Sequence, residues 1–196
     1  MLQKSLRPAV TNLITPLCKV LIKVGVTADL ITLLGSLGSC VSAIYFFARG
    51  EFFIGTLIVT LFVLSDLLDG TIARLSNAGG TRWGALMDST LDRLTDSIIV
   101  ISLVMYFRTR DEVVSILLLL VLVTGFLISY IRARAEALGL DCSVGFAERT
   151  ERLIILLVGT GLYGLGLSFA LSVALWTLVG ASLLTIAQRM LAVRKR

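Results

Sequence analysis

Histidine is absent from this 196-residue sequence, so any proton transfer must use aspartate, glutamate, lysine, tyrosine or water. Cysteine is scarce: Cys18, Cys40 and Cys142 are odd in number and lack CxxC spacing, which predicts packing residues and neither a disulfide framework nor a zinc site. Charged residues make up only 16% of the chain, and the mean hydropathy is +0.95. These values exclude a soluble domain with a polar surface and predict an integral membrane protein.

The net charge is +5, but the sequence outside the apolar segments has no stretch in which basic residues alternate with aromatic residues. Nucleic acid is therefore not expected as a partner. The excess of basic residues suits contact with anionic lipid head groups or with a phosphorylated substrate.

Long uncharged runs divide the chain into candidate membrane spans. Residues 30–48 and 113–131 are uncharged runs of 19 residues, each long enough to cross roughly 30 Å of hydrocarbon. The 36-residue run 153–188 is too long for one helix, and its glycine-rich middle predicts a tight turn between two spans. We predict an all-α fold with six transmembrane helices, near 30–48, 52–75, 84–107, 113–135, 151–168 and 170–190.

Residues 1–25 have a different pattern, with apolar residues recurring in steps of three and four and lysine or arginine between them. This pattern predicts an amphipathic segment that lies in the membrane interface, and a disordered basic leader is the alternative. We expect residues 26–196 to form one six-helix membrane domain.

The basic residues are distributed very unequally between the two ends of the predicted helices. With the N-terminus in the cytoplasm, fifteen lysines and arginines fall on the cytoplasmic side, and only Arg49, Arg108 and Arg110 fall on the other. The positive-inside rule therefore predicts that both termini are cytoplasmic. Most acidic residues fall on the same side, which predicts a polar chamber open to the cytoplasm.

Four aspartates stand beside apolar runs, although a carboxylate at the centre of a bilayer costs at least about 2.5–3.5 kcal/mol. Asp66 and Asp69 are spaced i, i+3, and Asp88 and Asp92 i, i+4, so each pair shares one face of its helix. The segment 74–84 is long enough to turn one helix back against the other. We expect the two pairs to face each other at the cytoplasmic end.

Four converging carboxylates repel one another and therefore need cations between them. Oxygen ligands of this kind suit Mg²⁺ or Mn²⁺, and two such ions can share bridging carboxylates. The alternative is that the aspartates pair with Arg74, Arg82 and Arg93, which balances the charge but does not explain two in-phase pairs. Asp96 continues the second face by one turn, and we expect it to be a hydrogen-bonding group and not a metal ligand.

The stretch 66–92 reads D-x-x-D-G-x-x-A-R-(x)9-G-x-x-x-D-x-x-x-D. Eight fixed positions over 27 residues make this a highly specific motif, and it resembles the signature of the CDP-alcohol phosphatidyltransferases, a family of six-helix membrane enzymes. The resemblance implies attack of an alcohol on the β-phosphorus of a CDP-linked lipid, with release of CMP. It also implies a bacterial cytoplasmic membrane protein that forms a homodimer.

The resemblance carries residue roles as well. It implies that Asp66, Asp69 and Asp88 hold one Mg²⁺ or Mn²⁺ ion, that Asp66, Asp88 and Asp92 hold a second, and that Asp92 is the general base. It implies contacts to the CDP-lipid from Asp29, Thr32, Gly70, Ala73, Arg74, Thr81 and Gly84. Helix capping is an equal explanation for Thr27 and Asp29.

Four further arginines fall at cytoplasmic helix ends: Arg132, Arg149, Arg152 and Arg189. Topology and lipid contact could explain any one of them, but together they exceed what a diphosphate already bound by metal and Arg74 requires. Arginine can bind a phosphate through two parallel hydrogen bonds, so we expect the acceptor alcohol to carry its own phosphate. We expect Glu136 to lie off the face that carries Arg132.

The segments around these arginines resemble those of bacterial family members that use inositol 1-phosphate and make phosphatidylinositol phosphate from CDP-diacylglycerol. Glycerol 3-phosphate is the alternative acceptor. A cation transporter is a remote alternative, because a transporter is expected to place polar groups through the full depth of the membrane, whereas several of these spans have uncharged middles.

Overall fold

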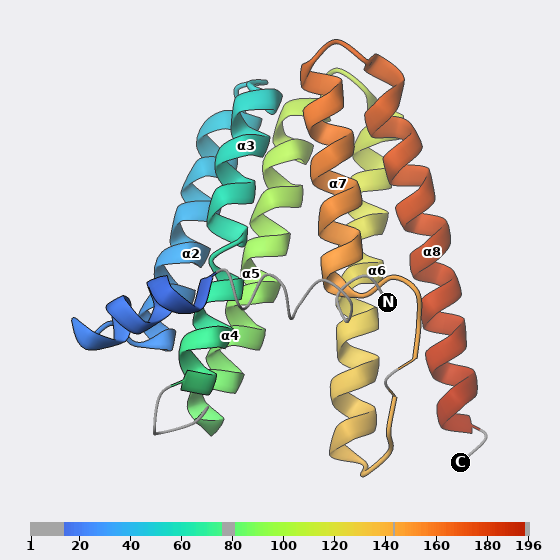
Figure 1. Ribbon diagram of the computed structural model, residues 1–196. Coiled ribbons are helices and arrows are strands. Elements are labelled where there is room, and N and C mark those ends of the chain that lie inside the picture. Colours follow the sequence, from blue (N-terminus) through green and yellow to red (C-terminus); the bar gives the residue numbers. More distant parts are fainter. Residues whose placement is uncertain (1–13, 76–80, 143, 195–196) are drawn as a thin grey trace. The chain divides into compact units, whose positions relative to one another are not determined.

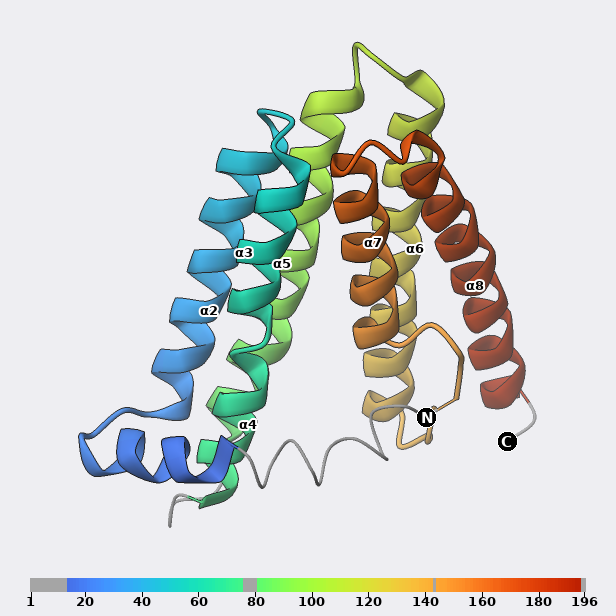
Figure 2. The ribbon, with the colours of Figure 1, turned by 45° about the horizontal axis from the view of Figure 1, so that its top comes forward.

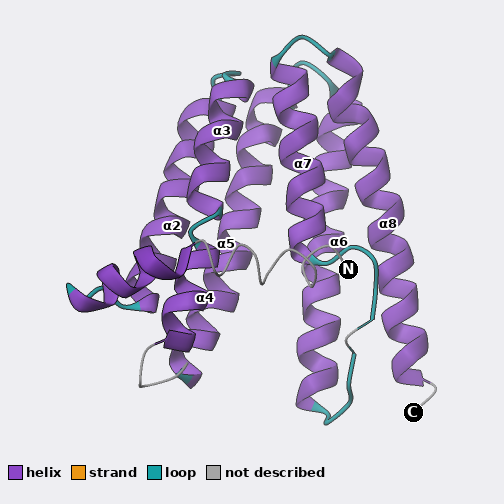
Figure 3. Cartoon of the chain, viewed as in Figure 1, coloured by secondary structure: helices purple, strands orange, loops and turns teal. Residues whose placement is uncertain are grey.

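The computed structural model describes residues 14–75, 81–142 and 144–194, without the side chain of Asp66 (Figure 1). Residues 1–13, which include half of the expected interfacial segment, and 76–80, in the link between the aspartate pairs, lie outside the described residues. Everything described is helix or connecting loop, with no strand (Figure 3). The all-α prediction is therefore confirmed for this part of the chain.

A short helix over 14–23 precedes the longer elements. The elements that follow are α2 (Ala28–Ser42), the π-helical turn η1 (Ala43–Phe47), α3 (Phe52–Val63), α4 (Asp66–Leu75), α5 (Arg82–Phe107), α6 (Glu112–Ala137), α7 (Arg149–Gly164) and α8 (Ser168–Arg194). Their ends are close to those expected from the uncharged runs. The predicted turn between the last two spans is the segment 165–167, where Gly166 has a φ of 95° that favours glycine.

Among the described residues, four helical stretches are long and apolar enough to cross a membrane: Ala28–Phe47, Phe52–Leu75, Glu112–Ala137 and Ser168–Arg194. The helix α7 is shorter, with 16 residues, and α5 carries the charges of the aspartate motif. The remaining two of the six predicted spans therefore do not meet the same test of length and composition.

The predicted helix over 52–75 is interrupted between α3 and α4. The Ser65 hydroxyl and the Ser65 amide both donate to the Phe62 carbonyl, at 2.6 and 3.0 Å, so the chain tightens where an α-helix would continue. Serine competes with regular helical hydrogen bonding in this way. As a result, α4 begins at Asp66, the first residue of the aspartate motif.

The chain folds as two compact units, and α2, α3 and α5 contribute to both. The first unit comprises the described residues of 1–41 and 58–95. Its core packs Cys18 of the 14–23 helix against Ile31 of α2 and Ile72 of α4, with Leu68 beside them. Because Gly35 has no side chain, α2 can lie directly against Ser65.

The second unit comprises residues 42–57 and the described residues from Asp96 onward. In it, α8 packs along both α6 and α7, and the three helices lie side by side in Figures 1 and 2. At one end, the Phe52 ring stacks on Phe107 with centroids 5.6 Å apart, and Tyr106 and Tyr163 meet Phe52 edge-on. Such aromatic contacts add to the burial energy and close this end of the unit.

The three cysteines are free and buried, as predicted from their number and spacing. Burial raises the pKa of the Cys18 thiol, so this side chain remains protonated at neutral pH. Cysteine therefore serves here as a small packing residue.

Candidate active site

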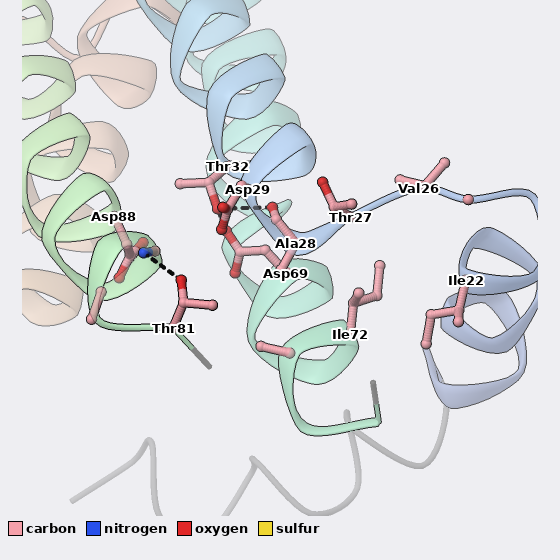
Figure 4. A pocket seen from close by; sticks show the side chains of 14 residues that line it. Ile22, Val26, Thr27, Ala28, Asp29, Thr32, Asp69, Ile72, Thr81 and Asp88 are labelled. Atoms are coloured by element: carbon pink, nitrogen blue, oxygen red, sulfur yellow. Dashed lines mark hydrogen bonds between the residues drawn. The ribbon is translucent and has the colours of Figure 1, made fainter. Parts of the chain in front are cut away.

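The first unit contains a pocket of about 600 Å³, a size typical of small-ligand sites. It is formed by the segment 22–32, by α4 and by the start of α5 (Figure 4). Its lining includes seven residues that the aspartate motif or the resemblance singled out: Asp29, Thr32, Asp69, Ala73, Thr81, Gly84 and Asp88. Residues from three separate elements thus meet at one cavity.

The start of α2 forms one wall of this pocket. The Thr27 hydroxyl accepts a hydrogen bond from the Leu30 amide at 3.2 Å, so Thr27 caps the helix. Asp29 lies in the first helical turn, and both Thr27 and Asp29 line the pocket. Capping was an equal explanation for both residues, and the capping hydrogen bond to the Leu30 amide belongs to Thr27.

The start of α5 lies against Asp29. A β-carbon added to Gly84 would approach the Asp29 carboxylate to 2.9 Å, so a larger residue here would require the Asp29 side chain to move. The Thr81 hydroxyl accepts from the Gly84 amide at 2.8 Å and caps α5. Thr81 thus has a structural role that the resemblance did not indicate, in addition to its place in the pocket wall.

Asp69 is the most buried of the motif's described carboxylates, with 7% of its surface exposed. The Thr32 hydroxyl lies 2.6 Å from Asp69 Oδ2, so α2 and α4 are joined across the pocket (Figure 4). The resemblance implied a nucleotide contact for Thr32, and this bond to the carboxylate was not expected from the sequence.

Asp88 and Asp92 lie on α5 with i, i+4 spacing, so they share one face of that helix, as predicted. Asp88 lines the pocket, and Asp92 Oδ2 lies 3.8 Å from the guanidinium of Arg93. Within the described residues, no group of three or more histidine, cysteine, aspartate or glutamate side chains could hold a metal. The side chain of Asp66 is outside that description, so the four-carboxylate cluster stays a prediction.

The donor chemistry of the pocket nevertheless fits a hard divalent cation. Asp69 and Asp88 line the same cavity from α4 and α5, and the other polar side chains that line it, Thr27, Asp29, Thr32 and Thr81, offer only oxygen atoms. Oxygen ligands are those that Mg²⁺ and Mn²⁺ prefer.

Among the described residues, little packs against the position that a Gly70 side chain would occupy. Of their atoms, an added β-carbon would come within 4 Å of the Arg74 guanidinium alone, at 3.9 Å. Arg74 is exposed and donates to the Thr71 hydroxyl at 3.0 Å, so this side chain is held along α4. The free space beside Gly70 is compatible with a ligand that approaches the helix backbone.

The four arginines expected at an acceptor site all belong to the second unit. Arg149, the first residue of α7, donates to Asp96 Oδ1 of α5 at 3.3 Å. This ion pair agrees with the expected hydrogen-bonding role of Asp96. Arg132 pairs with Glu136 at 2.9 Å on the exposed surface of α6. The expectation that Glu136 lies off the Arg132 face was wrong, because i, i+4 spacing places both on one face.

Arg152 and Arg189 are buried and bind backbone carbonyls. Arg152 donates to the Ala147 carbonyl at 2.9 Å. Arg189, which is 2% exposed, donates to Val144 at 2.9 Å and to Ile128 at 2.6 Å. The bonds to Ala147 and Val144 tie the α6–α7 loop to α7 and α8, and the bond to Ile128 ties α6 to α8. Sequence reasoning missed this anchoring role, because carbonyl partners 45 and 61 residues away leave no local signal.

The chain belongs to the CDP-alcohol phosphatidyltransferase family, whose family model matches residues 25–187. This assignment makes the protein a transferase and confirms the resemblance of the aspartate motif. It also leaves no support for the transporter alternative.

Relatives within the family are similar over nearly the whole chain. The phosphatidylinositol phosphate synthase of Streptomyces avermitilis is 42% identical over 205 aligned residues, which cover 100% of this chain and 83% of that protein. The crystal structure of the Mycobacterium tuberculosis phosphatidylinositol phosphate synthase with CDP-DAG bound matches with a TM-score of 0.85 and 44% identity, over 91% of this chain and 92% of that one. A second crystal structure of that enzyme, in complex with manganese and citrate, matches with a TM-score of 0.86 and 43% identity, over 92% and 88% of the two chains.

Proposed function

We propose that this protein transfers the phosphatidyl group of CDP-diacylglycerol to a hydroxyl of inositol 1-phosphate, which gives phosphatidylinositol phosphate and CMP. The observation that carries the proposal is the pocket in which Asp69 and Asp88 of the family motif meet Asp29 and Gly84. Relatives named phosphatidylinositol phosphate synthase, one of them crystallised with CDP-DAG, support the choice of substrates.

In this proposal, Asp66, Asp69, Asp88 and Asp92 hold two Mg²⁺ ions, which Mn²⁺ can replace. When bound, the ions offset the negative charge of the diphosphate. Asp92 accepts the proton of the acceptor hydroxyl, whose oxygen bonds to the β-phosphorus of the CDP-lipid. The bond between that phosphorus and the bridging oxygen breaks, and CMP leaves.

The other pocket residues bind and orient the donor. Arg74 binds the diphosphate, because a guanidinium offers paired donors to phosphate oxygens. Gly70 and Gly84 let the nucleotide approach the helix backbones. The remaining contacts to the CDP-lipid come from Asp29, Thr32, Ala73 and Thr81.

The acceptor phosphate is proposed to bind Arg132, Arg149, Arg152 and Arg189. Arg189 uses two donors for carbonyls, and a guanidinium carries five, so donors remain for a phosphate. Glycerol 3-phosphate presents the same phosphate chemistry, and the names of the relatives favour inositol phosphate over it.

The membrane arrangement is also part of the proposal. We take residues 26–196 as one catalytic domain in which α5 and α7 complete six spans, with the 14–23 helix and the residues before it in the interface. Leu17 and Val20 of that helix are exposed beside Lys19, as an interfacial helix requires. Both termini face the cytoplasm of a bacterial cell, and the chain acts as a homodimer in the cytoplasmic membrane.

Gly70→Ala is expected to separate function from stability. No described neighbour would clash with the new methyl group, and alanine favours a helix over glycine by about 1 kcal/mol, so thermal unfolding should stay at or slightly above the wild-type temperature. Binding of CDP-diacylglycerol should weaken about tenfold or more, because the methyl group occupies the ligand's space. Unchanged binding would refute the proposed role of Gly70.

The reaction itself is tested by CMP release from CDP-diacylglycerol by the purified protein. We expect release that needs both inositol 1-phosphate and Mg²⁺ or Mn²⁺, and that stops when EDTA is added. Release at the same rate without acceptor would indicate hydrolysis, and release in EDTA would refute the metal-dependent mechanism.

A further inference from the structure

A short hydrogen bond in the pocket joins two residues that no sequence pattern pairs. Thr32 lies in the second turn of α2, and its hydroxyl oxygen is 2.6 Å from Oδ2 of Asp69 on α4. Both side chains are buried, with 6% and 7% exposure, and both line the pocket. Figure 4 shows Thr32 on α2 and Asp69 on α4, with Asp29 close to both.

A threonine hydroxyl has a single proton, and two acceptors compete for it here. The Ala28 carbonyl, one turn earlier on α2, lies 3.1 Å from the hydroxyl oxygen, and Asp69 lies closer, at 2.6 Å. A distance of about 2.5–2.7 Å is that of a charge-assisted bond from a hydroxyl to a carboxylate. The proton of Thr32 therefore goes to Asp69.

Other buried threonines in this chain donate their hydroxyl proton to the backbone carbonyl one turn earlier in the same helix, whereas Thr32 donates to Asp69. Thr160 of α7 is fully buried, and its hydroxyl donates to the Leu156 carbonyl at 2.8 Å, one turn earlier. Thr32 has the equivalent carbonyl within reach. Its bond to Asp69 is thus a specific tie between two helices and not the usual arrangement of a buried helical threonine.

We infer that Thr32 is a positioning residue for the metal site: its hydroxyl fixes the orientation of the Asp69 carboxylate. This inference rests on the proposed function, in which Asp69 is a metal ligand. A bond to one carboxylate oxygen sets the plane of the group and so the direction of both oxygens. Partners of this kind commonly strengthen metal binding about 10- to 100-fold.

The inference also changes what Thr32 is expected to do for the nucleotide. If Thr32 contacts the cytidine directly, its loss should lower the affinity for the CDP-lipid and leave the affinity for metal unchanged. If its hydroxyl orients Asp69, its loss should lower the affinity for metal even when no nucleotide is present. The two roles are therefore separable by measuring metal binding without substrates.

The experiment is a Mn²⁺ titration of the purified full chain without substrates, followed by the electron paramagnetic resonance signal of free Mn²⁺. Thr32→Val keeps the shape of the side chain and removes the hydroxyl, and we expect its Mn²⁺ Kd to rise about 10- to 100-fold. Thr32→Ser restores the hydroxyl and should bind Mn²⁺ within about threefold of wild type. Thr160→Val, which also removes a buried hydroxyl, should bind as the wild type does.

Asp69→Asn distinguishes the failure of this inference from failure of the proposed function. If Asp69→Asn weakens Mn²⁺ binding and Thr32→Val does not, the positioning role is refuted and the metal site stands. If Asp69→Asn binds Mn²⁺ as tightly as wild type, Asp69 is no ligand, and both the metal site and the positioning role are refuted. If Thr32→Val and Thr32→Ser lose affinity equally, the effect does not depend on the hydroxyl, which also refutes the inference.

Discussion

Asp92→Asn is expected to abolish phosphatidyl transfer while CDP-diacylglycerol still binds. Asparagine matches aspartate in shape but cannot accept the proton of the acceptor hydroxyl, and a positioned general base contributes about 10²- to 10⁴-fold to rate. Asp92 also supplies a proposed metal ligand, so the loss should lie at or beyond the upper end of that range. CMP release with inositol 1-phosphate measures the loss, and equilibrium binding of labelled CDP-diacylglycerol measures what remains.

Asp111→Asn is the matched control for this substitution. The Asp111 side chain caps α6 by accepting from the Val114 amide at 3.0 Å, and asparagine caps helices equally well. This variant should keep wild-type CMP release. Turnover by Asp92→Asn within tenfold of wild type would rule out Asp92 as the general base.

Arg189→Met is expected to destabilise the protein and weaken binding of the acceptor together. Methionine keeps length and apolar bulk but cannot donate to the Val144 and Ile128 carbonyls. A buried acceptor left without its donor costs about 1–3 kcal/mol, which lowers the melting temperature and lets the α6–α7 loop open. The KM for inositol 1-phosphate should rise about tenfold or more, because a charged partner of the phosphate is lost as well.

Hydrogen exchange separates these two effects of Arg189→Met. Amides in 138–142 and 144–148 should exchange faster than in the wild type, and those in the middle of α8 should not. Arg194→Met, which changes an exposed arginine in the last turn of the same helix, should alter neither exchange nor KM. An unchanged KM in Arg189→Met would leave Arg189 with a structural role alone.

Regular features of this fold could be predicted from the sequence because they depend on local patterns. Uncharged runs and glycine-containing turns located the helices, and i, i+4 spacing placed Asp88 and Asp92 on one face. The break after α3 was missed, since a single serine within an apolar run gives no distinctive pattern.

Side-chain pairings between distant segments could not be predicted in the same way. The partner of Asp96 is 53 residues away at Arg149, and the partner of Thr32 is 37 residues away at Asp69. Nothing in the spacing of residues along the chain specifies such pairs. Such pairs depend on how the helices pack. The sequence indicated Thr32, Thr81 and Arg189 only as ligand contacts, and the structure shows that they also form hydrogen bonds within the protein.

Identification of the product tests the proposed function most directly. The purified protein should be given labelled CDP-diacylglycerol and Mg²⁺, with inositol 1-phosphate, free inositol and glycerol 3-phosphate offered in separate reactions, and the lipids identified by mass spectrometry. We predict phosphatidylinositol phosphate from the first reaction and little product from the other two. Phosphatidylglycerol phosphate as the main product, or phosphatidylinositol from free inositol at a similar rate, would contradict the proposed acceptor.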